Sequence, residues 1–148
     1  MTQKELEDKL REIKMVYSDR ARDLIQEAQP KLDDITKKKA VVIEEFNKAR
    51  EELEKSLSGL KEIGNELRRK GFANYSKEIE NNTKDKDNIK GKLRELRADF
   101  QREVQNLNAL YKSYTHILNH DLSENSKMRA QAKHEVMLKL EKKKEETL

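Results

Sequence analysis

The chain of 148 residues has no cysteine and no tryptophan, one proline and four glycines. Without cysteine it can form no disulfide, no thiolate metal site and no cysteine nucleophile. The glycines, at positions 59, 64, 71 and 91, do not have the spacing of phosphate-binding loops or dinucleotide-binding turns. These absences exclude several motif-based enzyme classes. We therefore expect a protein that is not an enzyme and binds no cofactor.

Long apolar runs are also missing. The longest uninterrupted run covers only residues 40–43, whereas a membrane-spanning helix needs about 20 apolar residues. The first residues alternate in charge and lack the apolar core of a signal peptide. We therefore expect a soluble, cytoplasmic protein that does not insert into a membrane.

Charged and helix-forming residues are abundant. Charged residues make up 42% of the chain and hydrophobic residues 34%, against about 25% and 45–50% in typical globular domains. This is too little apolar material for a thick core, but it is enough for a narrow seam between helices. The composition indicates long helices or a coiled coil, with disorder as the alternative.

Apolar residues recur at helical spacing from Leu6 to Leu67, in 17 steps over 61 residues, or about 3.6 residues per step. A stripe this regular argues against disorder. It also passes through Pro30, a residue that disrupts a helix interior. We therefore predict a helix over residues 3–70 that is kinked at Pro30. In the alternative, Pro30 opens a new helix after a break.

The first stop signal follows residue 70, where three basic residues precede Gly71. We predict a turn between Gly71 and Asn74, then a second helix over residues 75–120. Its segment 80–88 is polar and weakly patterned, and a disordered loop over 81–88 is the alternative.

Residues 121–124 carry an aspartate and a serine that can cap a helix. They predict a further C-terminal helix over residues 124–146. The expected fold class is therefore all-α. We expect a long antiparallel helical hairpin, or a coiled-coil-like bundle, as a single elongated helical domain over residues 1–148. Pairing positions whose numbers total about 146 sets Phe46 opposite Phe100 and Asn82 opposite Gly64.

The apolar stripe widens where three apolar residues follow one another, which a two-helix seam does not use. Such patches predict contact with a second copy of the chain, or with a helix folded back at Pro30. We favour a homodimer, with an unknown protein partner in addition. The candidate self-association residues are Val41, Val42, Ile43, Val136 and Met137.

Basic residues gather around the predicted turn. Residues 61–97 hold 11 basic and 7 acidic residues, whereas residues 1–60 hold 13 and 14. A basic end can meet an anionic partner such as nucleic acid, although a charge-rich helical chain also fluctuates by this much. The candidate contacts are Arg68, Arg69, Lys70, Lys77, Lys84, Lys86, Lys90, Lys92, Arg94 and Arg97.

No side-chain pattern predicts a catalytic or metal site. His116 and His120 have the spacing of a helical metal pair, but they fall away from the apolar stripe. We predict a structural or interaction protein, a coiled-coil scaffold or adaptor that displays a basic tip. The alternative is a nucleic-acid-binding accessory protein that uses the basic residues in 68–97.

Overall fold

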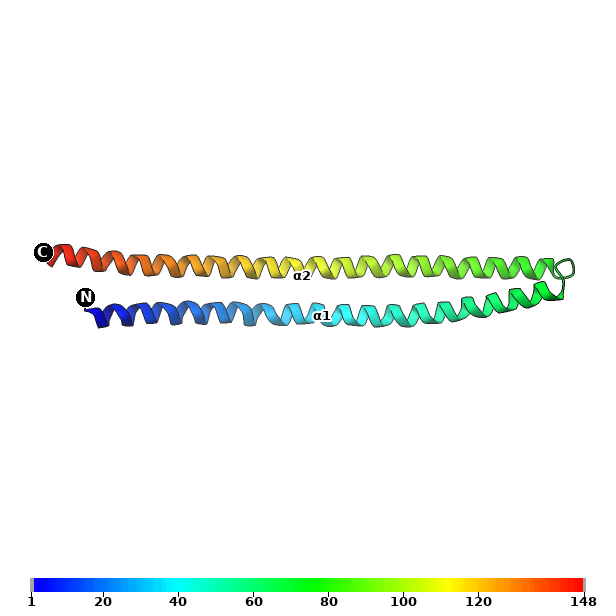
Figure 1. The fold of residues 1–148 in the computed structure, drawn as a ribbon, viewed down its shortest axis with the longest axis horizontal. Coiled ribbons are helices and arrows are strands. Elements are labelled where there is room, and N and C mark those ends of the chain that lie inside the picture. The colour runs from blue at the N-terminus through cyan, green and yellow to red at the C-terminus, as the bar shows by residue number, and fades with distance from the viewer. Residues whose placement is uncertain (1, 148) are drawn as a thin grey trace. The chain divides into compact units, whose positions relative to one another are not determined.

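The computed structural model describes the backbone of residues 2–147 and the side chains of residues 2–143. It consists of two helices, α1 (Gln3–Lys70) and α2 (Ser76–Thr147), joined by a turn at residues 71–75. The helices pack antiparallel as a hairpin (Figure 1), so the predicted all-α hairpin is confirmed.

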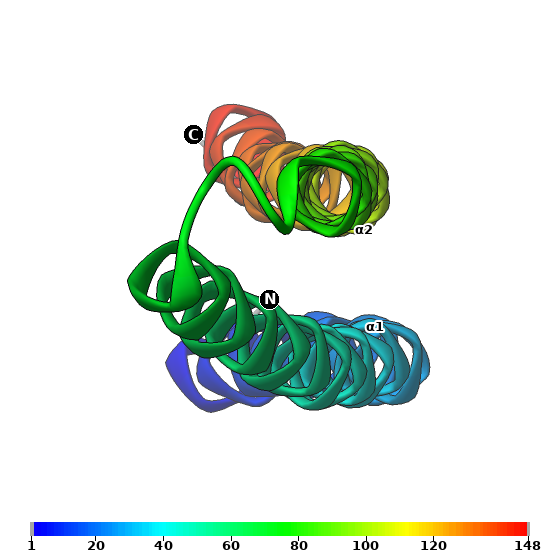
Figure 2. The same ribbon diagram turned by 90° about the vertical axis from the view of Figure 1, so that its right-hand side faces the viewer.

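The hairpin divides into two compact units. Unit 1 pairs residues 2–35 of the α1 side with residues 110–147 of α2, and unit 2 comprises residues 36–109, including the turn. In each unit, segments of α1 and α2 lie side by side and run in opposite directions (Figures 1 and 2).

The turn lies where the stop signal predicts it (Figure 2). Three basic residues fill the last turn of α1, where cations favour the negative end of the helix dipole. Gly71 then has a φ of 124°, in a region that residues with a side chain rarely adopt. The first helical bond of α2 is donated by the Ile79 N–H to the Tyr75 carbonyl at 2.9 Å.

An aromatic pair marks the seam of unit 2. The rings of Phe46 and Phe100 stack with centroids 4.1 Å apart and planes inclined by 16°, which confirms the predicted register at this pair. The Arg50 guanidinium lies 5.5 Å from the centroid of Phe46. Such contacts contribute about 0.5–1.5 kcal/mol beyond the area they bury.

The polar stretch after the turn is helical, so the disordered-loop alternative is wrong. Ile79 and Asn82 are only 5% and 6% exposed, and both occupy seam positions. The Thr83 hydroxyl donates to the Ile79 carbonyl at 3.0 Å, which satisfies it within the helix.

Asn82 joins the two helices through its side chain. Its Nδ2 donates to the Leu60 carbonyl at 2.8 Å, and its Oδ1 is buried without a hydrogen-bond partner. A Cβ atom at Gly64 would collide with this Oδ1 and would lie 3.3 Å from the Asn82 Cγ. The predicted pairing of positions 64 and 82 is confirmed, and the contact requires glycine.

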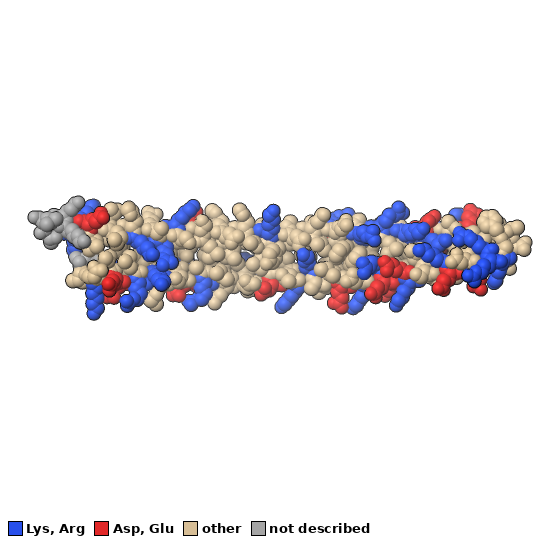
Figure 3. All heavy atoms as spheres, in the orientation of Figure 1, with Lys and Arg blue, Asp and Glu red and all other residues tan. Residues whose placement is uncertain are grey.

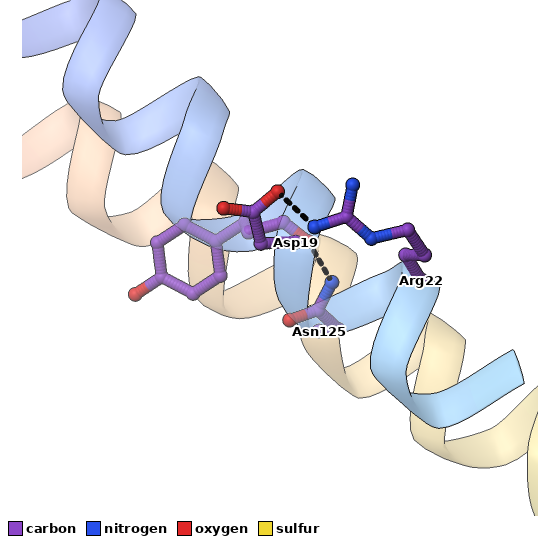
Figure 4. Close-up of polar contacts among 4 residues, drawn as sticks. Asp19, Arg22 and Asn125 are labelled. Carbon is purple, nitrogen blue, oxygen red and sulfur yellow. Dashed lines mark hydrogen bonds and ion pairs between the residues drawn. The ribbon is translucent and has the colours of Figure 1, made fainter. Parts of the chain in front are cut away.

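Asn125 has the same role in unit 1. It is 6% exposed, and its Nδ2 donates to the Tyr17 carbonyl at 2.9 Å (Figure 4). Its Oδ1 is also buried without a partner. Leu6, Leu32 and Ile35 are the buried hydrophobic residues of this unit. The apolar periodicity did not predict Asn125 as a seam residue, because it takes only apolar residues into account.

Figure 4 also shows an ion pair on α1 beside this contact, with Asp19 and Arg22 2.8 Å apart. Both side chains are more than half exposed. Exposed pairs of this kind contribute about 0–1 kcal/mol, so Asn125 makes the structural contact at this site.

The prediction of a further C-terminal helix over residues 124–146 is wrong. The helix α2 is continuous from Ser76 to Thr147, and the described residues form no third helix. Residues 121–124 contain neither glycine nor proline, so their capping side chains permit a helix start without breaking the helix that runs through them. In the unbroken helix α2, Asn125 lies on the seam, whereas Met128 is 41% exposed.

Helix α1 runs through Pro30 without interruption. The alternative in which Pro30 opens a new helix is therefore wrong, and the kink stays a prediction. Proline has no N–H to donate to the carbonyl four residues earlier, that of Gln26. Both residues are exposed, so water can reach this part of the helix.

We expect Gly64→Ala to destabilise the hairpin although alanine favours helix. The added methyl forces Asn82 away from the Leu60 carbonyl and leaves a buried donor unpaired, which costs about 1–3 kcal/mol. The propensity gain is only about 1 kcal/mol. Chemical denaturation should show a free energy of unfolding lowered by about 1 kcal/mol, the difference between these terms.

Gly91→Ala is the matched control, because a Cβ at position 91 meets nothing within 4 Å. It should raise the free energy of unfolding by about 1 kcal/mol. If both variants were stabilised equally, the close contact between positions 64 and 82 would not exist.

We expect Pro30→Ala to raise the free energy of unfolding by about 1–3 kcal/mol, because it restores a helix hydrogen bond and removes a steric clash. Thermal unfolding followed by circular dichroism measures this. Gln26→Ala, on the same helix, is the control and should change stability far less. An unchanged or lower stability of Pro30→Ala would show that the helix depends on the proline.

Candidate functional site

Many large apolar side chains remain exposed after the seam has formed. Each unit contains several of them, with exposures from 38% to 65%. Exposed apolar residues in such numbers indicate a surface for a partner. They are Met15, Val16, Ile25, Val41, Ile43, Ile63, Phe72, Leu110, Tyr111, Ile117, Met128, Met137 and Leu138.

A groove of about 580 Å³ lies in unit 2, and we call it the Val41 groove. Its apolar floor is made by Val41, Val42 and Leu107. Val41 is 52% exposed, although a valine gains about 1.5–3 kcal/mol from full burial. The remaining lining residues are Lys37, Lys38, Glu45, Glu103 and Asn106.

Charges of opposite sign flank the apolar part of this groove. Lys37 precedes Val41 by about one turn, and Glu45 follows it by about one turn. Because α2 runs antiparallel to α1, Glu103 lines the groove together with Glu45. The groove is therefore basic towards one end, apolar in the middle and acidic towards the other end.

The five predicted self-association residues are divided between the two units, three in unit 2 and two in unit 1. Val41 and Val42 line the Val41 groove, but Ile43 does not line it and is 38% exposed elsewhere on α1. Val136 is half-buried and Met137 is 44% exposed, and both belong to unit 1. The sequence identified the widened stripe, but the helix rotation of 100° per residue separates neighbouring side chains.

The ten predicted anion contacts all lie in unit 2, on both helices next to the turn. Nine are exposed and Lys86 is half-buried. Lys84 pairs with Glu80 at 3.8 Å. Basic and acidic side chains are interleaved over the end that carries the turn (Figure 3), so the local field is weaker than the basic count alone suggests.

Neither a metal-binding cluster nor a membrane-spanning helix is found in the described part of the chain. No group of three or more His, Asp and Glu side chains there is placed to hold a metal ion. His116 and His120 are both exposed. No described helix has an apolar stretch long enough to cross a bilayer.

A basic cluster in unit 1 was missed by the sequence reading. Arg11 and Lys14 of α1 meet Arg129 and Lys133 of α2 around a hollow of about 460 Å³, which we call the basic hollow. Leu10 and Met137 complete its lining. Counting charge along the chain hides this cluster, because its two halves are more than 100 residues apart. The antiparallel register is the signal that brings them together.

The chain was also compared with known proteins. No protein-family model, no curated protein and no solved structure matches it. Its function therefore has to be argued from its own surfaces.

Proposed function

We propose that the protein is a non-enzymatic structural and interaction protein, a helical scaffold or adaptor that forms a homodimer through the Val41 groove. The observation that carries this proposal is the exposure of Val41 in the groove, where it lies beside the half-buried Val42 and Leu107. A second copy that covers Val41, Val42 and Leu107 would remove them from water and stabilise the pair.

The charge arrangement favours a second copy as the occupant. In a twofold dimer the same patch lies on both sides of the interface. Lys37 and Glu45 are eight residues apart, or about 12 Å along the helix axis. Two grooves packed in opposite directions bring Lys37 of each copy towards Glu45 of the other, while their apolar parts meet. The patch is therefore self-complementary in charge as well as in polarity.

We expect Val41→Glu to weaken dimerisation at least tenfold, because it buries a carboxylate in an apolar interface. Sedimentation velocity over a range of protein concentrations measures the dissociation constant. Met15→Glu is the matched control, since Met15 is 60% exposed in unit 1 and lines none of the described hollows. A monomer at every concentration, or equal weakening by both variants, contradicts the proposal.

A charge exchange tests the orientation of the copies. Lys37→Glu and Glu45→Lys should each weaken the dimer by placing like charges opposite each other, and the double variant should recover most of the affinity. Without recovery, the two copies do not pack in opposite directions through this groove.

The second candidate is a nucleic-acid-binding accessory protein. Its support is the exposure of nine of the ten basic residues around the turn. Phosphate contacts would make binding strongly dependent on salt, because they release counterions from the nucleic acid. Apolar dimerisation would not show this dependence.

Replacing Lys84, Lys86, Lys90 and Lys92 by glutamate separates the two functions. If the basic residues bind phosphate, the fourfold variant should no longer shift the electrophoretic mobility of duplex DNA and single-stranded RNA. The sedimentation of the dimer should stay unchanged, because none of the four lysines lines the Val41 groove. Unchanged nucleic-acid binding by the fourfold variant would rule out this basic surface.

A further inference from the structure

The basic hollow of unit 1 concentrates charge of one sign. Two arginines and two lysines, contributed by both helices, surround it, and among the described side chains no acidic residue lines it. Glu7 lies one helical turn before Arg11. Within the described side chains, neither Glu7 nor any other acid forms an ion pair with the four cations.

Two of these cations are partly buried as residues, and one of them has a buried polar atom. Arg129 and Lys133 are half-buried, and the Arg129 Nε is buried without a hydrogen-bond partner. Burying a charged group is unfavourable unless it is paired and hydrogen-bonded. Four neighbouring cations also repel one another. Holding them around one hollow therefore costs free energy, and a bound anion would offset this cost.

The dimensions indicate what kind of anion fits. A hollow of about 460 Å³ falls within the roughly 300–1,000 Å³ typical of small-molecule sites. A ligand that neutralises four cations in this space must carry several negative charges close together. Phosphate groups do so, and arginine forks bind them through two parallel hydrogen bonds. Carboxylates on an acidic helix are spread one turn apart and match the hollow less well.

We propose that the basic hollow is a binding site for a phosphate-bearing anion. Arg11 and Arg129 donate to the phosphate oxygens from opposite helices, and Lys14 and Lys133 supply further positive charge. Leu10 and Met137 offer apolar surface to an organic part of the ligand. The site lies in unit 1, and none of its lining residues lines the Val41 groove.

The first test uses inorganic tripolyphosphate as the probe and isothermal titration calorimetry at low ionic strength. The wild-type chain should bind it, and Arg129→Gln with Lys133→Gln should weaken binding at least tenfold, roughly the effect of one lost charge-assisted contact. The matched control is Lys127→Gln with Lys139→Gln. It removes two positive charges from exposed positions on α2 outside the hollow, and it should change the affinity by a small factor only.

A second variant keeps the test decisive if the half-buried pair proves necessary for folding. Arg11→Gln with Lys14→Gln changes two exposed residues on the other side of the hollow. It should weaken tripolyphosphate binding at least tenfold as well, with helix content unchanged by circular dichroism. Equal loss in the matched control would mean attraction by overall charge and would overturn the proposal.

Vesicles distinguish the two sources of phosphate. Cosedimentation with phosphatidylcholine vesicles containing phosphatidic acid, without tripolyphosphate binding, would identify a lipid headgroup as the phosphate source. Tripolyphosphate binding without cosedimentation would identify a soluble ligand. Binding of neither probe overturns the proposal. Sedimentation velocity of the same variants should show an unchanged dimer, so this result and the result for the Val41 groove are independent.

Discussion

The alignment of α1 against α2 is the constraint on which every other feature depends. A periodic apolar seam alone tolerates sliding, because a shift by about two helical turns again sets apolar residues opposite one another.

Two buried asparagines remove this freedom. Asn82 donates to Leu60 in unit 2 and Asn125 donates to Tyr17 in unit 1, and each pair of residue numbers totals 142. A shifted alignment would leave both donors buried and unpaired. Each asparagine also keeps a buried Oδ1 to which no protein group donates.

Much of this alignment can be predicted from the sequence. The 3.6-residue stripe and the stop before Gly71 predicted the hairpin and set Phe46 opposite Phe100 and Asn82 opposite Gly64, and the structure has both contacts. The predicted boundary after residue 120 is wrong, because α2 continues through the side chains that can cap a helix. A cap stabilises a helix end but does not create one. In a segment without glycine or proline, the continued packing of α2 against α1 prevails.

The candidate surfaces were harder to predict than the fold, for two physical reasons. Neighbouring residues on a helix point in different directions, so Val41 and Ile43 belong to different sides of α1. Charges that are distant along the chain become neighbours only in the folded hairpin, as Lys14 and Lys133 do. Linear counts of apolar and charged residues detect neither effect. The structure instead gives each unit its own surface, an apolar groove with mixed flanking charge in unit 2 and a basic hollow in unit 1.

The single turn also determines the order in which these surfaces can form. Because the chain reverses once, the two asparagine contacts span very different lengths, 22 residues for Asn82 and 108 for Asn125. Closing the longer loop from an open chain costs about 1.4 kcal/mol more in conformational entropy. If α1 and α2 pair first beside the turn and then progressively farther from it, no long open loop has to close and this cost is avoided. In that order the basic hollow would form last, because its four cations are far from the turn along the chain on both helices. A ligand bound there would join α1 to α2 within unit 1 and would stabilise only the chain in which these two segments have paired.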